Sequence, residues 1–144
     1  MRRKVTVVGA GMTGGTIAQR LAETGYIDVV LQDIIEGLPQ GKALDLAQSA
    51  AVAGFNGRVT GSNDWNDTAG SEVVVITSGV PRKPGMTREE LLNINAGIVR
   101  DVASAAVKHS PDATLVVFAN PMDAMCHVTL DTTKLPKSRV VGQG

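Results

Sequence analysis

Short apolar runs alternate along the chain with longer stretches in which apolar residues recur at helical spacing. The runs of strand length are 5–8, 28–33, 58–61, 73–77, 113–118 and 139–142. The helical stretches are 13–24, 37–53, 87–109 and one that follows Pro121 and ends near Thr133, while 63–70 form a polar loop or a short helix. The runs 5–8 and 73–77 are almost wholly apolar, which is typical of parallel strands that helices cover on both faces.

This alternation of strands and helices predicts one α/β domain, because two βαβαβ halves with six strands make a complete Rossmann fold. Right-handed crossovers then give a six-stranded, doubly wound parallel sheet with the order 3-2-1-4-5-6. In this order the carboxyl ends of the first and fourth strands meet at the switch point, where such sheets bind ligands. We therefore expect residues 9–14 to lie beside residues 77–82.

A glycine-rich turn, Gly9-Ala10-Gly11-Met12-Thr13-Gly14, joins the first strand to the first helix. In a dinucleotide site of GxGxxG spacing, Gly9 provides the sharp turn, Gly11 a close approach to the pyrophosphate, and Gly14 close packing of helix on sheet. The helix N-terminus adds free N–H groups and a positive dipole end. The pattern alone is weak, but a strand precedes it and a helix follows it, as a dinucleotide site requires.

An acidic residue, Asp33, ends the second strand 19 residues after Gly14. A carboxylate there accepts hydrogen bonds from the ribose hydroxyls of an adenosine and repels a 2′-phosphate, which favours NAD over NADP. The alternatives are a solvated acidic residue at a strand end, and a flavin or NADP site that uses the same glycine pattern. The glycines upstream favour the ribose role.

The composition excludes several classes of protein. Fourteen basic and fourteen acidic side chains give no net charge, so we expect no nucleic-acid partner. No apolar run approaches the roughly 20 residues of a membrane span, and the basic start 1–4 precedes too short an apolar run for a signal peptide. A single cysteine, Cys126, excludes an intrachain disulfide and fits a reducing, cytoplasmic location. We expect Cys126 to be a small buried residue and the chain to hold no metal.

Longer motifs extend through most of the chain. They are the glycine-rich turn, Asp33, Gly37-Leu38-Pro39-Gln40-Gly41-Lys42-Ala43-Leu44-Asp45-Leu46, Arg58-Val59-Thr60-Gly61, Thr77-Ser78-Gly79-Val80-Pro81-Arg82-Lys83-Pro84-Gly85-Met86-Thr87-Arg88, Asn95 and Ala119-Asn120-Pro121-Met122-Asp123. With these motifs the chain resembles the N-terminal half of the NAD-dependent malate dehydrogenases of the lactate-dehydrogenase-like family. The resemblance implies an oxidoreductase of the tricarboxylic acid cycle whose substrates are malate and oxaloacetate and whose cofactor is NAD.

The same resemblance implies the binding residues. The cofactor site would comprise Gly9, Ala10, Gly11, Met12, Thr13, Gly14, Asp33, Thr77, Ser78, Gly79, Asn95, Phe118, Ala119 and Asn120. Arg82 would pair with the second carboxylate of the substrate through two parallel hydrogen bonds, Arg88 would polarise the reacting carbonyl, and the Asn120 amide would hold the substrate. The alternatives are a solvated loop cation at Arg82, a surface arginine at Arg88, and a turn initiator at Asn120.

Hydride transfer also needs an acid/base for the hydroxyl proton, and imidazole suits this role because its pKa lies near neutrality. In the family that this chain resembles, the catalytic histidine and its aspartate belong to the second half. His109 and His127 do not match that motif, so we expect no catalytic residue among 1–144, a C-terminal substrate domain outside them, and cofactor binding without turnover. The alternative is a stand-alone NAD-binding or sensing module, which would have no use for Arg82, Arg88 and Asn120.

The helix 37–53 has a broad apolar character for a surface helix, with Ala43, Leu44, Ala47 and Ala51 on one side. The resemblance implies that the family uses this helix between subunits. We therefore expect a homo-oligomer formed through 37–53.

Overall fold

Strands and helices alternate along residues 2–144, the part of the chain that the computed structural model describes. In order, the elements are β1 (Arg3–Val8), α1 (Met12–Glu23), β2 (Ile27–Gln32), α2 (Leu38–Ala53), β3 (Val59–Ser62), the 3-10 helix η1 (Trp65–Thr68), β4 (Val73–Ile76), α3 (Arg88–His109), β5 (Thr114–Val117), α4 (Met122–Thr133), the 3-10 helix η2 (Lys137–Arg139) and β6 (Val140–Gly142). Every predicted strand and helix is present, with ends that differ by a residue or two. The polar stretch 63–70 contains η1.

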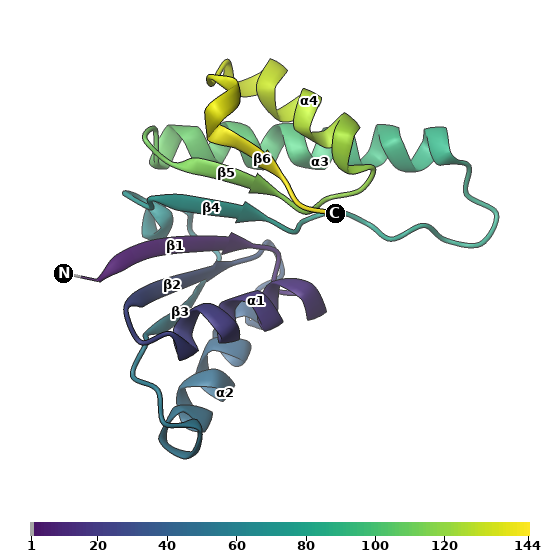
Figure 1. Ribbon diagram of the computed structural model, residues 1–144. Helices are drawn as coiled ribbons and strands as arrows, with labels where there is room; N and C mark the ends of the chain where they lie inside the picture. Colours follow the sequence, from purple (N-terminus) through teal and green to yellow (C-terminus); the bar gives the residue numbers. More distant parts are fainter. Residues whose placement is uncertain (1) are drawn as a thin grey trace.

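The six strands form one parallel sheet in the order β3-β2-β1-β4-β5-β6, which confirms the predicted order (Figure 1). Val8, the last residue of β1, is in register with Gln32 of β2 and Ile76 of β4. The carboxyl ends of these three strands are therefore level, and their following loops start from one edge of the sheet.

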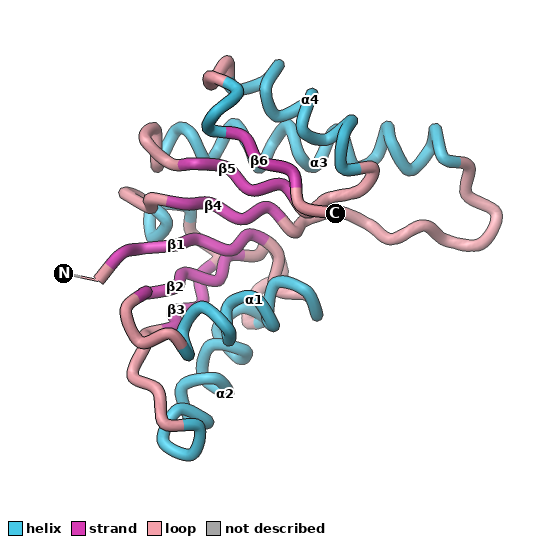
Figure 2. The backbone as a smooth tube through the Cα atoms, in the orientation of Figure 1, coloured by secondary structure: helices cyan, strands magenta, loops and turns pink. Residues whose placement is uncertain are grey.

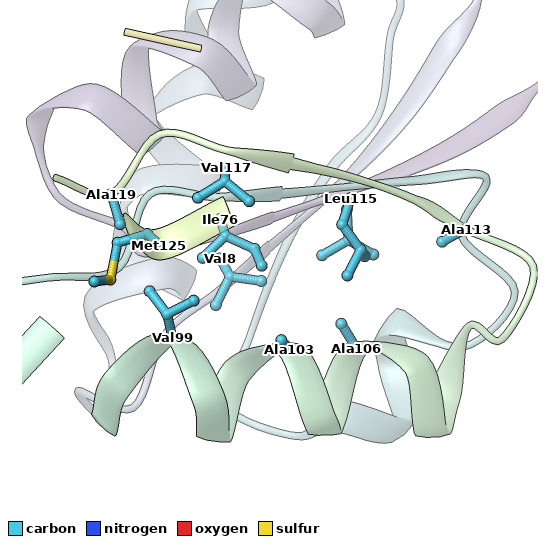
Figure 3. Packing of buried hydrophobic residues seen from close by; sticks show 11 residues of the cluster. Val8, Ile76, Val99, Ala103, Ala106, Ala113, Leu115, Val117, Ala119 and Met125 are labelled. Atoms are coloured by element: carbon cyan, nitrogen blue, oxygen red, sulfur yellow. The ribbon is translucent and has the colours of Figure 1, made fainter. Parts of the chain in front are cut away.

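Helices cover both faces of the sheet, with α1 and α2 on one face and α3 and α4 on the other (Figure 1). The side of α3 that faces the sheet carries Val99, Ala103 and Ala106, which are all at most 1% exposed. Figure 3 shows these small side chains below Ile76 and Leu115. Because small side chains let a helix approach closely, α3 lies near the sheet along its C-terminal turns.

Three predicted strands, β2, β4 and β5, end one residue early, and after two of them the next side chain bonds to neighbouring backbone. Asp33 leaves β2, and its carboxylate accepts hydrogen bonds from the N–H groups of Ala10 and Ile35. Thr77 leaves β4, and its hydroxyl donates to the carbonyl of Val8 at 2.9 Å. Both side chains thus lie at the carboxyl edge of the sheet.

None of the helices within residues 2–144 has the combination of length and apolar character that crossing a membrane requires.

Candidate functional site

The glycine-rich turn brings the start of α1 against the end of β4. Gly9 has φ +104°, in the left-handed region, and an added Cβ there would lie 2.6 Å from the Thr77 hydroxyl oxygen. A Cβ at Gly14 would overlap the Gly9 carbonyl oxygen, whereas one at Gly11 would meet no atom within 4 Å. Gly9 and Gly14 are therefore needed for the fold of the turn itself, and Gly11 faces open space.

The N-terminus of α1 beside Gly11 is free of side chains that would compete with an anion. Gly11 is the N-cap, it makes no side-chain capping bond, and the first turn of the helix carries no acidic residue. Met12 and Thr13 at this end are exposed. Uncapped N–H groups and the positive end of the helix dipole together suit a phosphate.

Asp33 joins the end of β2 to this turn. One carboxylate oxygen accepts a hydrogen bond from the Ala10 N–H at 2.6 Å, and the other accepts from the Ile35 N–H at 2.9 Å. Each carboxylate oxygen has two lone pairs, so both keep acceptor capacity after these bonds. Asp33 is half-buried and lines the adjoining hollow.

The hollow next to Asp33 lies between the carboxyl ends of β1 and β2 and the flank of α3. Its apolar walls are Ile34, Trp65, Ile98 and Val102. Ile34 is 90% exposed, an unusual position for a large aliphatic side chain beside a polar turn. The hollow thus offers apolar walls for a flat group and, at its edge, the Asp33 carboxylate.

The sequence did not single out these wall residues. Ile98 and Val102 are one helical turn apart, so their pattern predicts only that they share a face of α3. Trp65 comes from η1, and its ring stacks on the His109 ring with centroids 6.3 Å apart. The neighbouring N-cap Asp64 accepts a hydrogen bond from the Asn66 N–H, which lowers the pKa of Asp64 below its ordinary value.

The β4–α3 loop, 77–87, starts beside the glycine-rich turn and then leaves the sheet. The hydroxyls of Thr77 and Ser78 donate toward the Val8 carbonyl, and Thr77 Oγ1 also lies 3.2 Å from the Gly9 carbonyl oxygen. The expectation that 9–14 lie beside 77–82 is thus confirmed for the start of this loop. Figure 2 shows the rest of the loop as a long arm that extends beyond the sheet. Arg82 on this arm is exposed, and its Nε–H donates to the Met86 carbonyl at 3.0 Å.

Arg88 is exposed at the first position of α3. Here Thr87 and Glu90 form a capping box: Thr87 Oγ1 accepts from the Glu90 N–H, and Glu90 Oε2 accepts from the Thr87 N–H. These bonds satisfy the helix end without Arg88, so its guanidinium is available where the arm joins α3.

Residues 118–120 follow β5 at the same edge of the sheet. Phe118 is half-buried, Ala119 is buried, and Asn120 is exposed. The peptide bond between Asn120 and Pro121 is cis. Asn95 of α3, which the resemblance assigns to the cofactor site, is 1% exposed. Its side chain forms hydrogen bonds with the backbone of Val80 and Asn120.

The remaining candidates for chemistry lie on the helices. His127 is exposed on α4. Cys126, which the sequence predicts to be buried, is partly exposed, and burial followed by the charge of Asp123 raises the pKa of its thiol. Residues 2–144 contain no group of three His, Cys, Asp or Glu side chains placed to hold a metal ion.

Comparison with known proteins gives a consistent result. The family profile "lactate/malate dehydrogenase, NAD binding domain" matches residues 3–142. A malate dehydrogenase of Dehalococcoides mccartyi is 58% identical over 139 residues, which cover 96% of this chain and 45% of that protein. The malate dehydrogenase of Thermomicrobium roseum is 55% identical over 143 residues, which cover 99% of this chain and 46% of that protein. This chain thus spans less than half the length of the curated relatives that it matches.

Solved structures share the fold over nearly the whole chain. The malate dehydrogenase of Cryptosporidium parvum has a TM-score of 0.93 and 44% identity, covering 99% of this chain and 45% of that one. The lactate dehydrogenase of the same organism, solved with lactic acid and nicotinamide adenine dinucleotide, has a TM-score of 0.92 and 42% identity, with the same coverage. The chain belongs to the family of the NAD-binding domain of lactate and malate dehydrogenases.

Proposed function

We propose that this chain is the cofactor-binding half of an NAD-dependent malate dehydrogenase, which interconverts malate and oxaloacetate. One observation carries the proposal of an NAD site: the Asp33 carboxylate is hydrogen-bonded to the glycine-rich turn and borders an apolar hollow. A carboxylate in this position suits a ribose with a free 2′-hydroxyl. The relatives named malate dehydrogenase support the reaction.

The parts of the site fit the parts of the dinucleotide. The pyrophosphate would lie over Gly11, where no Cβ obstructs it and the α1 N–H groups are free. The adenine would enter the hollow between Ile34 and Ile98, with its ribose on Asp33. The nicotinamide end would lie at the switch point, between 77–79 and 118–120, with Ala10, Met12 and Thr13 along the way. When bound, the nicotinamide supplies or accepts the hydride.

The substrate end of the site combines two cations and an amide. Arg82 and Arg88 would reach the substrate from the β4–α3 arm, and the Asn120 amide would meet it from the end of β5. A guanidinium binds a carboxylate through two parallel hydrogen bonds, so Arg82 would select a substrate with a second carboxylate. The Nε–H bond from Arg82 to the Met86 carbonyl leaves four N–H donors for this purpose.

We also propose that the acid/base comes from a C-terminal domain outside these 144 residues. His109 is stacked on Trp65 and His127 is exposed on α4, so neither accompanies Arg82, Arg88 or Asn120. The coverage of relatives, 45–46% of their length, supports a further domain. We place the protein in the cytoplasm, in line with its single cysteine, and as a homo-oligomer through α2.

Trp65 allows a direct test, because it is the single tryptophan of the chain and lines the hollow. We expect NADH to quench Trp65 fluorescence in a saturable manner, and the nicotinamide fluorescence of NADH to increase with the same midpoint. NADPH should bind at least about tenfold more weakly. In the control Trp65→Phe, only the nicotinamide signal should remain. An absence of saturable NADH binding would overturn the proposal, and rapid oxaloacetate reduction by this chain alone would overturn the proposed external acid/base.

A further inference from the structure

We propose that Asn95 is a positioning residue that clamps the base of the β4–α3 loop to the β5–α4 turn. Its side-chain oxygen accepts a hydrogen bond from the Val80 N–H at 2.8 Å. Its Nδ2 donates to the Val80 carbonyl at 3.3 Å and to the Asn120 carbonyl at 2.7 Å. One buried side chain thus fastens two segments that lie 15 and 25 residues away along the chain.

The contacts require a primary amide at this position. Toward Val80, the Asn95 side chain acts as a second peptide group, because it accepts from the N–H and donates to the carbonyl of the same residue. An aspartate would keep the acceptor and lose both donors, and an alanine would lose all three bonds. Gly79 lies directly against the amide: an added Cβ there would be 3.3 Å from its oxygen, so the loop passes close over Asn95.

Burial makes these bonds important for local order. Asn95 is 1% exposed, and breaking its bonds would leave polar backbone groups without partners beside the sheet. The loop beyond Val80 is different, since 81–85 are all exposed and extend away from the sheet (Figure 2). The clamp therefore marks the boundary between a fixed base, 77–80, and an exposed arm that begins at Pro81.

The clamp has a consequence for the two substrate residues on either side of it. Arg82 is two residues beyond the fixed Val80, and Asn120 offers its carbonyl to Asn95 while its side chain remains exposed. Asn95 would therefore set the spacing between the arm and Asn120 without touching the ligand. This consequence rests on the proposed function, whereas the clamp itself does not.

The resemblance to the family implies a direct contact between Asn95 and the cofactor. In this structure both N–H groups of the side chain donate to Val80 and Asn120, its oxygen accepts from Val80, and the residue is 1% exposed. An effect of Asn95 on the nicotinamide end of the site would then be transmitted through the two loops. This difference between direct and transmitted effects can be measured.

The experiment uses three variants of this chain: Asn95→Ala, the isosteric Asn95→Asp, and the control Asn93→Ala, which removes an exposed asparagine from the same helix. The readouts are amide hydrogen exchange of Val80 without ligand, and the Kd values of NADH and of ADP-ribose. ADP-ribose carries the groups assigned to Gly11 and Asp33 but no nicotinamide.

In Asn95→Ala we expect Val80 exchange to rise about tenfold, the effect of one lost buried hydrogen bond, and NADH binding to weaken by a similar factor. ADP-ribose binding should stay within about twofold of wild type, because Asp33 and the glycine-rich turn do not contact Asn95. Asn95→Asp should also raise Val80 exchange and weaken NADH binding, since it loses both donors and places a carboxylate oxygen against the carbonyls of Val80 and Asn120. Asn93→Ala should match wild type throughout.

Each contrary outcome overturns one defined part of the proposal. Unchanged Val80 exchange in Asn95→Ala would refute the clamp, and weaker NADH binding with unchanged exchange would mean direct contact. Equal weakening of NADH and ADP-ribose would mean a general structural role and would refute the positioning role. If Asn95→Ala fails to fold, the same comparison is made with Asn95→Asp. If wild type binds neither ligand, the proposed function fails, and the exchange measurement alone decides on the clamp.

Discussion

At the residue scale, the Asp33 carboxylate has two partners on the protein and a proposed third on the ligand. Its oxygens accept from Ala10 and Ile35, which fixes the carboxylate between the glycine-rich turn and the hollow. The carboxylate is thus oriented before any cofactor arrives. A preorganised group binds with less loss of conformational freedom, so a small change here should alter cofactor choice strongly.

We predict that Asp33→Ser weakens NADH binding about tenfold and reduces the preference for NADH over NADPH. The serine loses a charged acceptor, worth about 1.5–3 kcal/mol in a hydrogen bond, and removes the repulsion of a 2′-phosphate. Fluorescence titration with both cofactors measures the ratio. Asp112→Ser, at an exposed carboxylate in the α3–β5 turn, is the control. An unchanged ratio in Asp33→Ser would contradict the ribose assignment.

The sequence predicts single residues well where their spacing carries the information. The 19-residue separation of Gly14 and Asp33 places the carboxylate at the right strand end, and the structure adds its bond to Ala10. For Asn95 the sequence has no comparable signal. Its partners come from two other loops, so its bonds depend on how α3, the β4–α3 loop and the β5–α4 turn meet in three dimensions.

At the element scale, the glycine-rich turn separates folding from binding within one short motif. We predict that Gly11→Ala leaves the melting temperature within about 2 °C of wild type and weakens NADH binding about tenfold or more. Its φ of −69° suits alanine and its surroundings are open, so the new Cβ would meet only a bound pyrophosphate. Thermal unfolding and NADH titration of the same preparation measure both effects.

Gly14→Ala is the matched comparison, because it adds the same methyl group to the same turn. Its Cβ would overlap the Gly9 carbonyl and lie 2.9 Å from Thr77 Oγ1, so α1 must move away from the sheet. We expect a loss of about 1–3 kcal/mol in the free energy of unfolding, as for overpacking. Equal stability of the two variants would show that close packing of α1 does not depend on Gly14.

The sequence predicts the helices and strands because their patterns are local. It misses their exact ends because these depend on contacts with other segments. Apolar runs and helical spacing identify the strands and helices correctly. Asp33 and Thr77 lie one residue beyond their strands, where backbone groups of other segments bind their side chains. Such bonds form only once the sheet has assembled, so a linear pattern does not contain them.

At the scale of the whole molecule, the strand order follows from right-handed crossovers, but the shape of the hollow does not. Four wall residues come from three separate places: Ile34 after β2, Trp65 in η1, and Ile98 with Val102 in α3. All of them belong to one chain. We therefore predict that the proposed cofactor site is complete within one subunit, whatever assembly the chain forms.

Assembly through α2 can then be tested without disturbing that site. The face of α2 that carries Leu44, Ala47 and Ala51 is exposed, and Leu44 is 60% exposed. Exposed aliphatic residues on one helix face are typical of an interface between subunits. We predict that the 144-residue chain self-associates in sedimentation velocity and that Leu44→Lys raises the dissociation constant at least about tenfold, because a lysine would place a charge in an apolar interface.

Tyr26→Lys is the matched control, since Tyr26 is 64% exposed but lies outside α2. It should sediment as wild type does, and all three proteins should bind NADH equally, because none of the changes touches the hollow or the glycine-rich turn. Association that Leu44→Lys leaves unchanged would place the interface elsewhere. A loss of NADH binding on dissociation would mean that a second subunit contributes to the site, which would contradict its completeness within one chain.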